Sequence, residues 1–401
     1  MFTTLRRSRP VRGLAVLSVL AVAASGCDGS GFTPGGGGDD SPETTAAAVV
    51  EAKLTTNVKP GATAVPVSTV LRVSAVDGTL SSVTVSSKAG KVTGRIVNGT
   101  RWVASERLEP GARYRMRAVA ENSDGSTVES ITPFATQALG LDQQTYPSVA
   151  PLQGETVGVG MPVIVTFDLP VTDKAAFEKH MTVTATPNQA GSWRWVSSTE
   201  AHWRPRTYWK AGSKVSVDVD INGVSAGGGI YGQEDRDVDF EVGDAHIYKV
   251  NARTHQMKVF ENGKLLRTLP ITTGKPGFTT RSGVKVIMEK FETRRMNSET
   301  VGIPAGSSEA YDIDDVRWAM RLTNSGEFIH AAPWSVGSQG YANVSHGCTG
   351  MSTENAGWLY SISRRGDVVE YVGTDRPMEP DNGYGDWNIS WASYQADSAL
   401  G

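Results

Sequence analysis

Short runs of alternating apolar and polar residues, separated by turn-forming pairs, fill two stretches of about 100 residues each. Neither stretch shows the 3.6-residue period of an amphipathic helix. Runs at this spacing are typical of the strands of an antiparallel β-sandwich. The runs are 71–76, 83–85 and 114–119 in the first stretch, and 163–167, 181–184 and 215–219 in the second. This pattern restricts both stretches to an all-β architecture.

The two stretches also resemble each other, as tandem copies of one domain would. Gly111 and Gly212 each come shortly before an alternating run. We therefore predict two immunoglobulin-like domains, at 48–138 and 139–243, although neither contains the cysteine pair of antibody domains.

The second predicted domain is rich in tryptophan, and these side chains have two interpretations. Aromatic residues spaced by two could stack on sugar rings. They could instead fill the core of the sandwich and one face against a neighbouring domain, which we favour because aromatic side chains dominate cores. The residues are Trp193, Trp195, Trp203 and Trp209, with His202 among them.

Residues 244–372 have a different pattern and predict a third, mainly β domain with one main helix. The expected strands are 246–250, 256–260, 265–272, 284–288, 318–322, 327–330 and 367–372, and the expected helix is 353–364. Asn262-Gly263 predicts a tight hairpin turn. From about 291 to 317 we expect a long Gly- and Ser-rich loop, and loops of this length are usually lids or binding loops. Residues 373–401 form a short extension with two tryptophans, which we expect to dock on the rest of the chain.

The first 27 residues resemble an export signal. Four arginines precede an apolar run at 13–24, which is short for a membrane span but suits a signal peptide. Small residues lie directly before Cys27, as in bacterial lipoprotein signals, where the thiol is lipidated; an ordinary signal peptide with a chance cysteine is the alternative. Residues 28–47 are mainly Gly, Ser, Pro, Thr and acidic residues, and predict a flexible tether. We expect an extracytoplasmic protein that faces the cell wall and is anchored to the membrane through Cys27.

The charge balance excludes one class of partner. The chain has 39 Lys and Arg residues against 42 Asp and Glu residues, a formal net charge of −3. Because no basic excess is present to displace the counterions of a phosphate backbone, we expect no nucleic-acid partner.

The chain contains two cysteines, and the second, Cys348, lies among residue types that suit nucleophilic catalysis. If Cys27 carries a lipid, Cys348 has no partner for a disulfide, and exported proteins rarely keep a thiol without a use for it. A thiol nucleophile needs a base and donors for the oxyanion. His330 and His346 offer two imidazoles, and Gly347 lets backbone N–H groups approach a substrate carbonyl closely. The residues therefore predict a thiol–imidazole enzyme.

Three other interpretations of this thiol are weaker. Zinc could bind Cys348, His330 and His346, but no fourth ligand and no paired ligand spacing is present. A packed core thiol does not suit so polar a run. Ser345 could be the nucleophile, but no suitable acid completes a triad.

The segment HAAPWSVGSQGYANVSHGC, residues 330–348, resembles the signature of the L,D-transpeptidases, which carry the YkuD-type catalytic domain of bacterial cell walls. The order of the segments is also similar to that of actinobacterial members: a lipoprotein signal, two immunoglobulin-like domains, a catalytic domain and a tryptophan-bearing tail. The resemblance covers nearly all of the chain beyond the tether. One departure is Gly350, because the family often has Asn or Arg two positions after the cysteine.

The resemblance implies a reaction on peptidoglycan stem peptides. Cys348, as thiolate, attacks the carbonyl of the diamino acid at position three of a donor tetrapeptide, D-Ala leaves, and a thioester acyl-enzyme forms. The side-chain amine of position three on a second stem then attacks, which gives a 3→3 cross-link. The resemblance also implies that carbapenems acylate the same thiol, and that no cofactor or metal is needed.

The resemblance further implies roles for individual residues. His330 is the base and is oriented by the backbone carbonyl of Ala331. The N–H groups of Gly347 and Cys348 form the oxyanion hole, and His346 supports the pocket wall. The substrate-binding residues are Tyr311 and Met296 near the lid, and Ser345, His346, Trp334 and Gly350 around the thiol.

The sequence leaves two other functions open. An L,D-carboxypeptidase would pass the acyl group from the same thiol to water, and nothing in the sequence separates water from an amine as acceptor. A wall-binding lipoprotein with a vestigial catalytic domain is less favoured, because a decayed site would not be expected to keep both His330 and Cys348.

Overall fold

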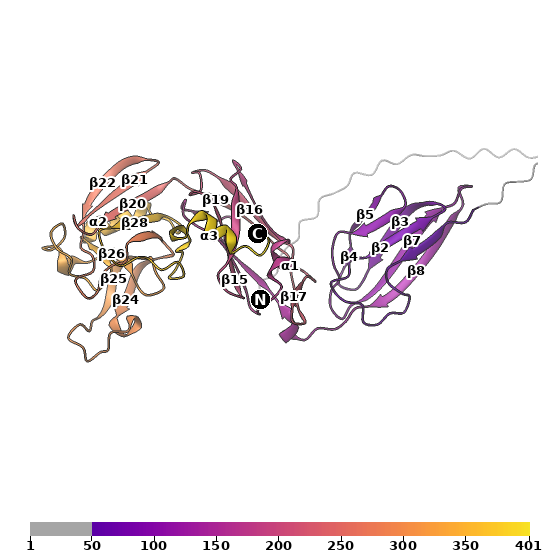
Figure 1. The fold of residues 1–401 in the computed structure, drawn as a ribbon, viewed down its shortest axis with the longest axis horizontal. Coiled ribbons are helices and arrows are strands. Elements are labelled where there is room, and N and C mark those ends of the chain that lie inside the picture. The colour runs from indigo at the N-terminus through magenta and orange to yellow at the C-terminus, as the bar shows by residue number, and fades with distance from the viewer. Residues whose placement is uncertain (1–49) are drawn as a thin grey trace, which may run out of the picture. The chain divides into compact units, whose positions relative to one another are not determined.

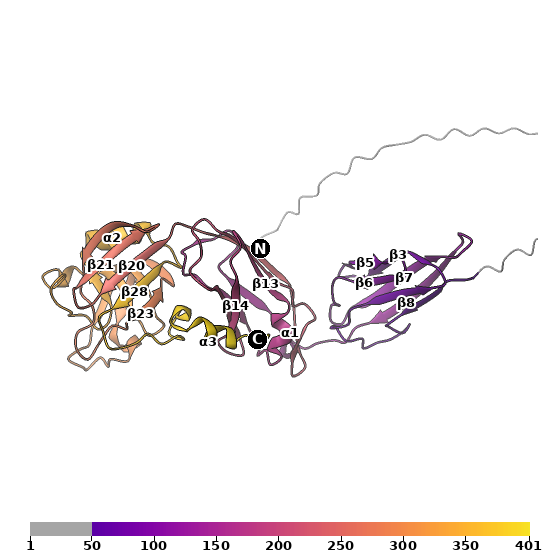
Figure 2. The same cartoon turned by 45° about the horizontal axis from the view of Figure 1, so that its top comes forward.

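The computed structural model describes residues 50–401, which are mainly β and build three hydrophobic cores. Figures 1 and 2 show layered strands with few helices. The predicted signal peptide, the tether and Cys27 lie outside the described residues. Within residues 50–401 the helices are all too short or too polar to cross a membrane.

The first sandwich consists of two four-stranded sheets, with strand orders β1-β2-β6-β5 and β4-β3-β7-β8. The strands are β1 Lys53–Thr56, β2 Arg72–Val76, β3 Thr79–Ser86, β4 Lys91–Val92, β5 Gly94–Val97, β6 Arg101–Ala104, β7 Arg113–Glu121 and β8 Thr127–Ala135. Every second residue of β7 is buried, from Tyr114 to Ala120, and these side chains fill the core. The predicted alternation at 114–119 is confirmed.

The second sandwich pairs the sheets β10-β12-β15-β14 and β11-β19-β16-β13, with a small ribbon β17-β18-β9. Its strands are β9 Gln144–Thr145, β10 Pro147–Ala150, β11 Thr156–Val157, β12 Val163–Phe167, β13 Met181–Thr186, β14 Gly191–Trp195, β15 Glu200–Pro205, β16 Lys214–Val219, β17 Ser225–Gly227, β18 Ile230–Gly232 and β19 Arg236–Val242, and a short helix, α1, spans Lys174–Glu178. All four tryptophans of this domain are buried in one core. The core interpretation is therefore confirmed over sugar stacking.

The two sandwiches repeat one packing device. In the first, Gly94 lies under the ring of Trp102 on the neighbouring strand; in the second, Gly191 lies under the ring of Trp203. A Cβ at either glycine would overlap the indole, so only glycine lets the ring lie flat across the next strand. This shared device supports the interpretation of the sandwiches as copies of one design.

The third domain consists of two sheets, β22-β21-β20-β28-β23 and β24-β25-β26-β27, with helix α2 packed against the second. Its elements are β20 His246–Asn251, β21 Gln256–Glu261, β22 Lys264–Pro270, β23 Gly283–Val286, β24 Glu289–Asn297, β25 Asp312–Arg321, β26 Phe328–Ala331, β27 Thr349–Met351, α2 Thr353–Ile362 and β28 Val368–Val372. Asn262 and Gly263 both have positive φ and join β21 to β22, as predicted. Helix α2 begins after Ser352, whose Oγ accepts from the N–H of Asn355 at 3.2 Å.

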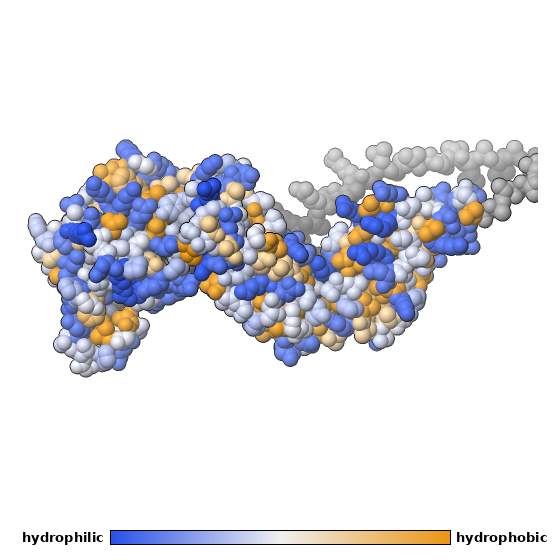
Figure 3. All heavy atoms as spheres, viewed as in Figure 1, coloured by the Kyte–Doolittle hydropathy of each residue, from blue (hydrophilic) through white to orange (hydrophobic). Residues whose placement is uncertain are grey.

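The prediction of a continuous loop from about 291 to 317 is wrong. Strands β24 and β25 pair over much of it as an antiparallel arm, and only 298–311 contains no strand. No residue of β24 is buried, so its sequence lacks the apolar alternation by which the core strands were recognised. Figure 1 shows the arm projecting from the domain, and Figure 3 shows hydrophobic side chains gathered towards its tip.

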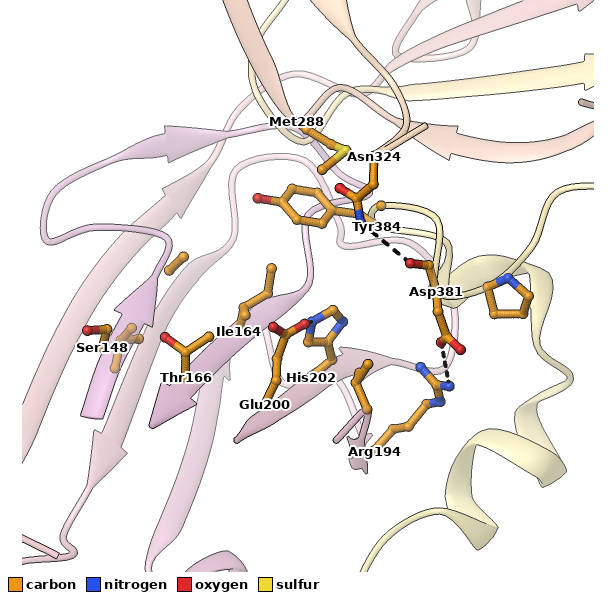
Figure 4. Close-up of a pocket in the computed structure, with 15 residues that line it drawn as sticks. Ser148, Ile164, Thr166, Arg194, Glu200, His202, Met288, Asn324, Asp381 and Tyr384 are labelled. Atoms are coloured by element: carbon orange, nitrogen blue, oxygen red, sulfur yellow. Dashed lines mark hydrogen bonds and ion pairs between the residues drawn. The ribbon is translucent and has the colours of Figure 1, made fainter. Parts of the chain in front are cut away.

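The C-terminal extension docks on the second sandwich, as expected. It ends in helix α3, Trp391–Ala396. The indole N–H of Trp387 donates to the carbonyl of Gly160 at 2.8 Å. The guanidinium of Arg204 lies 4.2–5.2 Å from the ring centres of Trp387, Trp391 and Tyr394. Figure 4 shows the neighbouring cavity of about 320 Å³, where side chains of this sandwich and of the extension meet.

Candidate active site

Cys348 lies directly before β27, beside the strand that carries His330. Strands β26 and β27 are parallel, with His330 opposite Gly350. Gly347 has φ +124°, a conformation that favours glycine, and this turn places the half-buried thiol directly before the strand. The hydroxyl of Ser345 accepts from the N–H of Gly347 at 3.1 Å and donates to the carbonyl of Cys348 at 2.6 Å. Ser345 therefore fixes the turn that presents the sulfur.

The imidazole of His330 is held in one tautomer. Its Nδ1 lies 2.8 Å from the carbonyl oxygen of Ala331, and a carbonyl only accepts, so Nδ1 carries the proton and donates. The lone pair of a neutral His330 is therefore on Nε2. Burial lowers the pKa of His330, with the Ala331 contact acting in the opposite direction, so the ring stays neutral at neutral pH.

The thiol of Cys348 is also neutral in the resting site. Burial raises its pKa to about 11; the Phe328 N–H acts against this rise, the Glu327 carboxylate adds to it, and the Lys285 ammonium reduces it. The Sγ atom lies 3.6 Å from the carbonyl oxygen of Gly326. A neutral thiol and a neutral imidazole that line the same cavity suit proton transfer during attack rather than a preformed thiolate.

Of the two predicted oxyanion donors, one already makes a hydrogen bond among the residues that the structure describes and the other does not. The N–H of Gly347 is already hydrogen-bonded to Ser345. The N–H of Cys348 makes no hydrogen bond to another group within residues 50–401, so it is the donor that is free to bind an oxyanion. The two N–H groups differ because the hydroxyl of Ser345 lies in the turn and accepts from the N–H of Gly347, which stabilises the turn.

A largely apolar cavity of about 250 Å³ brings most of the predicted site residues together. Those that line it are Cys348, His330, Tyr311, Met296, Ser345, His346, Trp334 and Gly350. Gly347 and Ala331 do not line it, and contribute backbone groups. The cavity also contains residues that the sequence analysis missed, namely Thr272, Ile313, Val316, Ala332, Ser335 and Val344. Ile313 and Val316 were missed because their strand was expected to be a loop.

His346 links the lid loop, residues 298–311, to the rest of the site through a contact with Glu309. Its Nε2 lies 2.7 Å from Oε2 of Glu309, which also pairs with the ammonium of Lys275 at 2.5 Å. The ring of His346 packs against Phe278 at 4.7 Å and Tyr311 at 5.1 Å between centroids. The predicted wall position of His346 is consistent with these contacts. Lys275 and Glu309 were not recognised in the sequence, because the fold brings Glu309 to both His346 and Lys275 from distant positions.

A second cavity of about 420 Å³ reaches Cys348 under the lid loop. Tyr311 and Met296 line this cavity as well as the apolar one, so the thiol lies where the two meet. Unlike the apolar cavity, it contains three arginines, Arg294, Arg295 and Arg321, against one acid, Glu299.

A buried ionic network lies behind the thiol. Lys285 is fully buried and contacts one carboxylate oxygen of Glu327, and Arg281 Nη1 contacts the other at 3.1 Å. The side chain of Glu327 also lies beside Gly347. Among residues 50–401 no group of three or more His, Cys, Asp or Glu side chains is arranged to hold a metal ion.

Models of two known protein families match this chain. A model of the bacterial Ig domain matches residues 62–225, and a model of the L,D-transpeptidase catalytic domain matches residues 245–370. The fold therefore combines Ig-like domains with a YkuD catalytic domain. L,D-transpeptidase 2 of Mycobacterium tuberculosis is 38% identical over 350 residues, which cover 86% of this chain and 85% of that protein.

Two other relatives support the same assignment. L,D-transpeptidase 5 of Mycobacterium tuberculosis is 34% identical over 334 residues, which cover 81% of this chain and 72% of that protein. The solved structure of the L,D-transpeptidase LdtMt1 in complex with imipenem is 42% identical, with a TM-score of 0.50, and covers 56% of this chain and 97% of that one. The chain belongs to the L,D-transpeptidase family and is an enzyme of this class.

Proposed function

We propose that the enzyme forms 3→3 cross-links in peptidoglycan through a thioester on Cys348. The observation that carries the proposal is the contact between Nδ1 of His330 and the carbonyl of Ala331, since it leaves Nε2 as the base in the cavity that holds the thiol. Membership of the family supports the substrate class.

In the first step the sulfur of Cys348 attacks the carbonyl of residue three of a donor tetrapeptide while Nε2 of His330 takes the thiol proton. The N–H of Cys348 donates to the oxyanion. Collapse breaks the peptide bond, His330 returns the proton to the amine of D-Ala, and the thioester remains. An amine of a second stem then attacks the thioester, loses a proton to His330, and the thiol is restored.

Two further properties belong to this proposal. Because a relative has been solved with imipenem, we propose that carbapenems acylate Cys348. We also propose that the protein is extracytoplasmic and anchored through Cys27, as the export signal and tether indicate.

Incubation of the purified protein with a disaccharide tetrapeptide, followed by mass spectrometry, tests the proposal. A cross-linked dimer with loss of D-Ala is expected, and it should disappear in Cys348→Ala and His330→Ala. His180→Ala, a histidine of the second sandwich outside the site, is the matched control. Tripeptide without dimer would instead identify an L,D-carboxypeptidase, and the absence of any acyl-enzyme would favour a wall-binding lipoprotein.

A further inference from the structure

The two cavities that meet at Cys348 differ in charge, and this difference bears on substrate recognition. The apolar cavity contains His330 and aliphatic side chains. The second cavity contains Arg294 and Arg321. A peptide that reacts at the thiol has groups on both sides of the reacting carbonyl, and an anionic group is stabilised on the basic side.

Arg294 is a guanidinium without an ion pair inside residues 50–401. It lies on β24, is half-buried, and packs over the rings of Phe291 and Phe328, 4.5 Å and 5.8 Å from their centroids. The next residue, Arg295, is different, because its guanidinium is paired with Asp312 at 2.6 Å. The stacking on two rings holds the Arg294 guanidinium in place without neutralising it.

A second arginine shares the same aromatic ring. The guanidinium of Arg321 lies 4.7 Å from the centroid of Phe328. Its Nε pairs with Glu289 at 2.9 Å, and its Nη1 donates to the carbonyl of Thr323 at 3.3 Å, but its Nη2 has no acceptor among the described residues. Two guanidinium groups on one ring, in a cavity that opens to the thiol, form a site with unused donors for an anion.

We propose that Arg294, assisted by Arg321, binds a carboxylate of the stem peptide in the basic cavity that reaches Cys348. The proposal rests on the proposed transpeptidase function. Guanidinium groups match carboxylates through two parallel hydrogen bonds. Two stem carboxylates have this chemistry: that of the D-Ala that leaves the donor, and that of the acceptor stem which replaces it.

Arg294→Ala tests the site, because β24 has no buried residue and the variant should fold. With a tetrapeptide donor we expect the kcat/KM for D-Ala release to fall about 10- to 100-fold, the size of effect expected for a lost charged hydrogen bond. With the unaltered enzyme, a donor whose C-terminal carboxylate is replaced by an amide should react as slowly as the normal tetrapeptide does with Arg294→Ala. With Arg294→Ala, the amide should make no further difference to the rate. Arg294→Lys should recover part of the rate, because it keeps the charge but not the paired geometry.

Arg317→Ala is the charge control, because Arg317 lies on the facing strand, is exposed and lines neither cavity. If Arg294→Ala releases D-Ala normally but transfers the acyl group slowly to the acceptor, the carboxylate is the acceptor's and the site is supported. If Arg294→Ala and Arg317→Ala release D-Ala at equal rates and also transfer the acyl group at equal rates, the site is refuted. An unaltered enzyme that forms no acyl-enzyme at all would instead refute the proposed function, so the two failures are distinguishable.

Discussion

Raising the pH should weaken the contact between the second sandwich and the C-terminal extension, because His202 joins them as a cation. Its Nε2 lies 2.9 Å from Glu200, and its Nδ1 lies 3.0 Å from Asp386 on the extension. Figure 4 shows His202 and Glu200 side by side in the cavity. A neutral imidazole has one N–H and cannot donate to two carboxylates. The bound form is therefore the imidazolium.

The size of the effect follows from the shift in pKa. Burial by itself lowers the pKa of His202, but the Asp386 and Glu200 carboxylates outweigh it and raise the pKa to about 9 from an ordinary 6.5. A raised pKa contributes stability that is fully present below pH 6.5 and is lost as the pH rises through 9. The difference corresponds to about 3 kcal/mol, most of which is still present at neutral pH.

Urea unfolding followed by tryptophan fluorescence measures this loss, because Trp387 and Trp391 lie at the contact. Between about pH 7 and pH 10 the free energy of unfolding of the junction should fall by about 2–3 kcal/mol. His202→Gln should be less stable at pH 7 and should lose less on going to pH 10. His246 is also paired with two carboxylates and its pKa is raised, so its contribution remains in both proteins. If the free energy of unfolding changes equally with pH in the two proteins, His202 is not the group that titrates.

Two further predictions concern the thiol site. Lys285→Met should destabilise the protein by about 1–3 kcal/mol, because the buried carboxylate of Glu327 loses its ammonium partner and keeps only Arg281. Lys285→Met/Glu327→Leu should recover part of this loss, because Arg281 still pairs with Glu379. Urea unfolding of both variants measures this, and a double variant no more stable than the single one would contradict it. The rate of thiol acylation should be flat through pH 6.5 and fall only at lower pH, because burial lowers the pKa of His330. A stopped-flow pH profile that instead rises steadily towards the Cys348 pKa of about 11 would indicate attack by a preformed thiolate.

Much of the fold could be predicted because its strands bury one face. The run 163–167 is a strand with the same bounds, and the hairpin at Asn262-Gly263 forms where the turn pair lies. The β24–β25 arm could not be found in this way beyond the predicted strand at 318–322, because both strands are rich in charged residues and β24 has no buried residue. Apolar and polar residues alternate along a strand when one of its faces packs on a core. A strand that pairs with its neighbour outside the core therefore does not show this alternation in its sequence.

The core of the site could be predicted for a related reason. The base, its backbone partner, the turn and the thiol all lie within residues 330–348, and they were visible as one segment. The groups that adjust this chemistry are distant in sequence. Lys285 lies in a strand where a lysine would ordinarily face solvent, yet it is fully buried because Glu327, 42 residues away, neutralises it.

The proposed carboxylate site lies outside the segment 330–348, unlike the thiol and the base. A thiol and an imidazole must be close and rigidly held, and a short segment with a glycine turn achieves this. If the stem carboxylate binds in the basic cavity, as we propose, the group that recognises it comes from an element outside residues 330–348. Strand β24 supplies that element: Arg294 is brought beside the ring of Phe328, two residues before His330, by pairing with β25 rather than by any sequence motif. Under this proposal, the β24–β25 arm helps to determine which peptides the enzyme accepts.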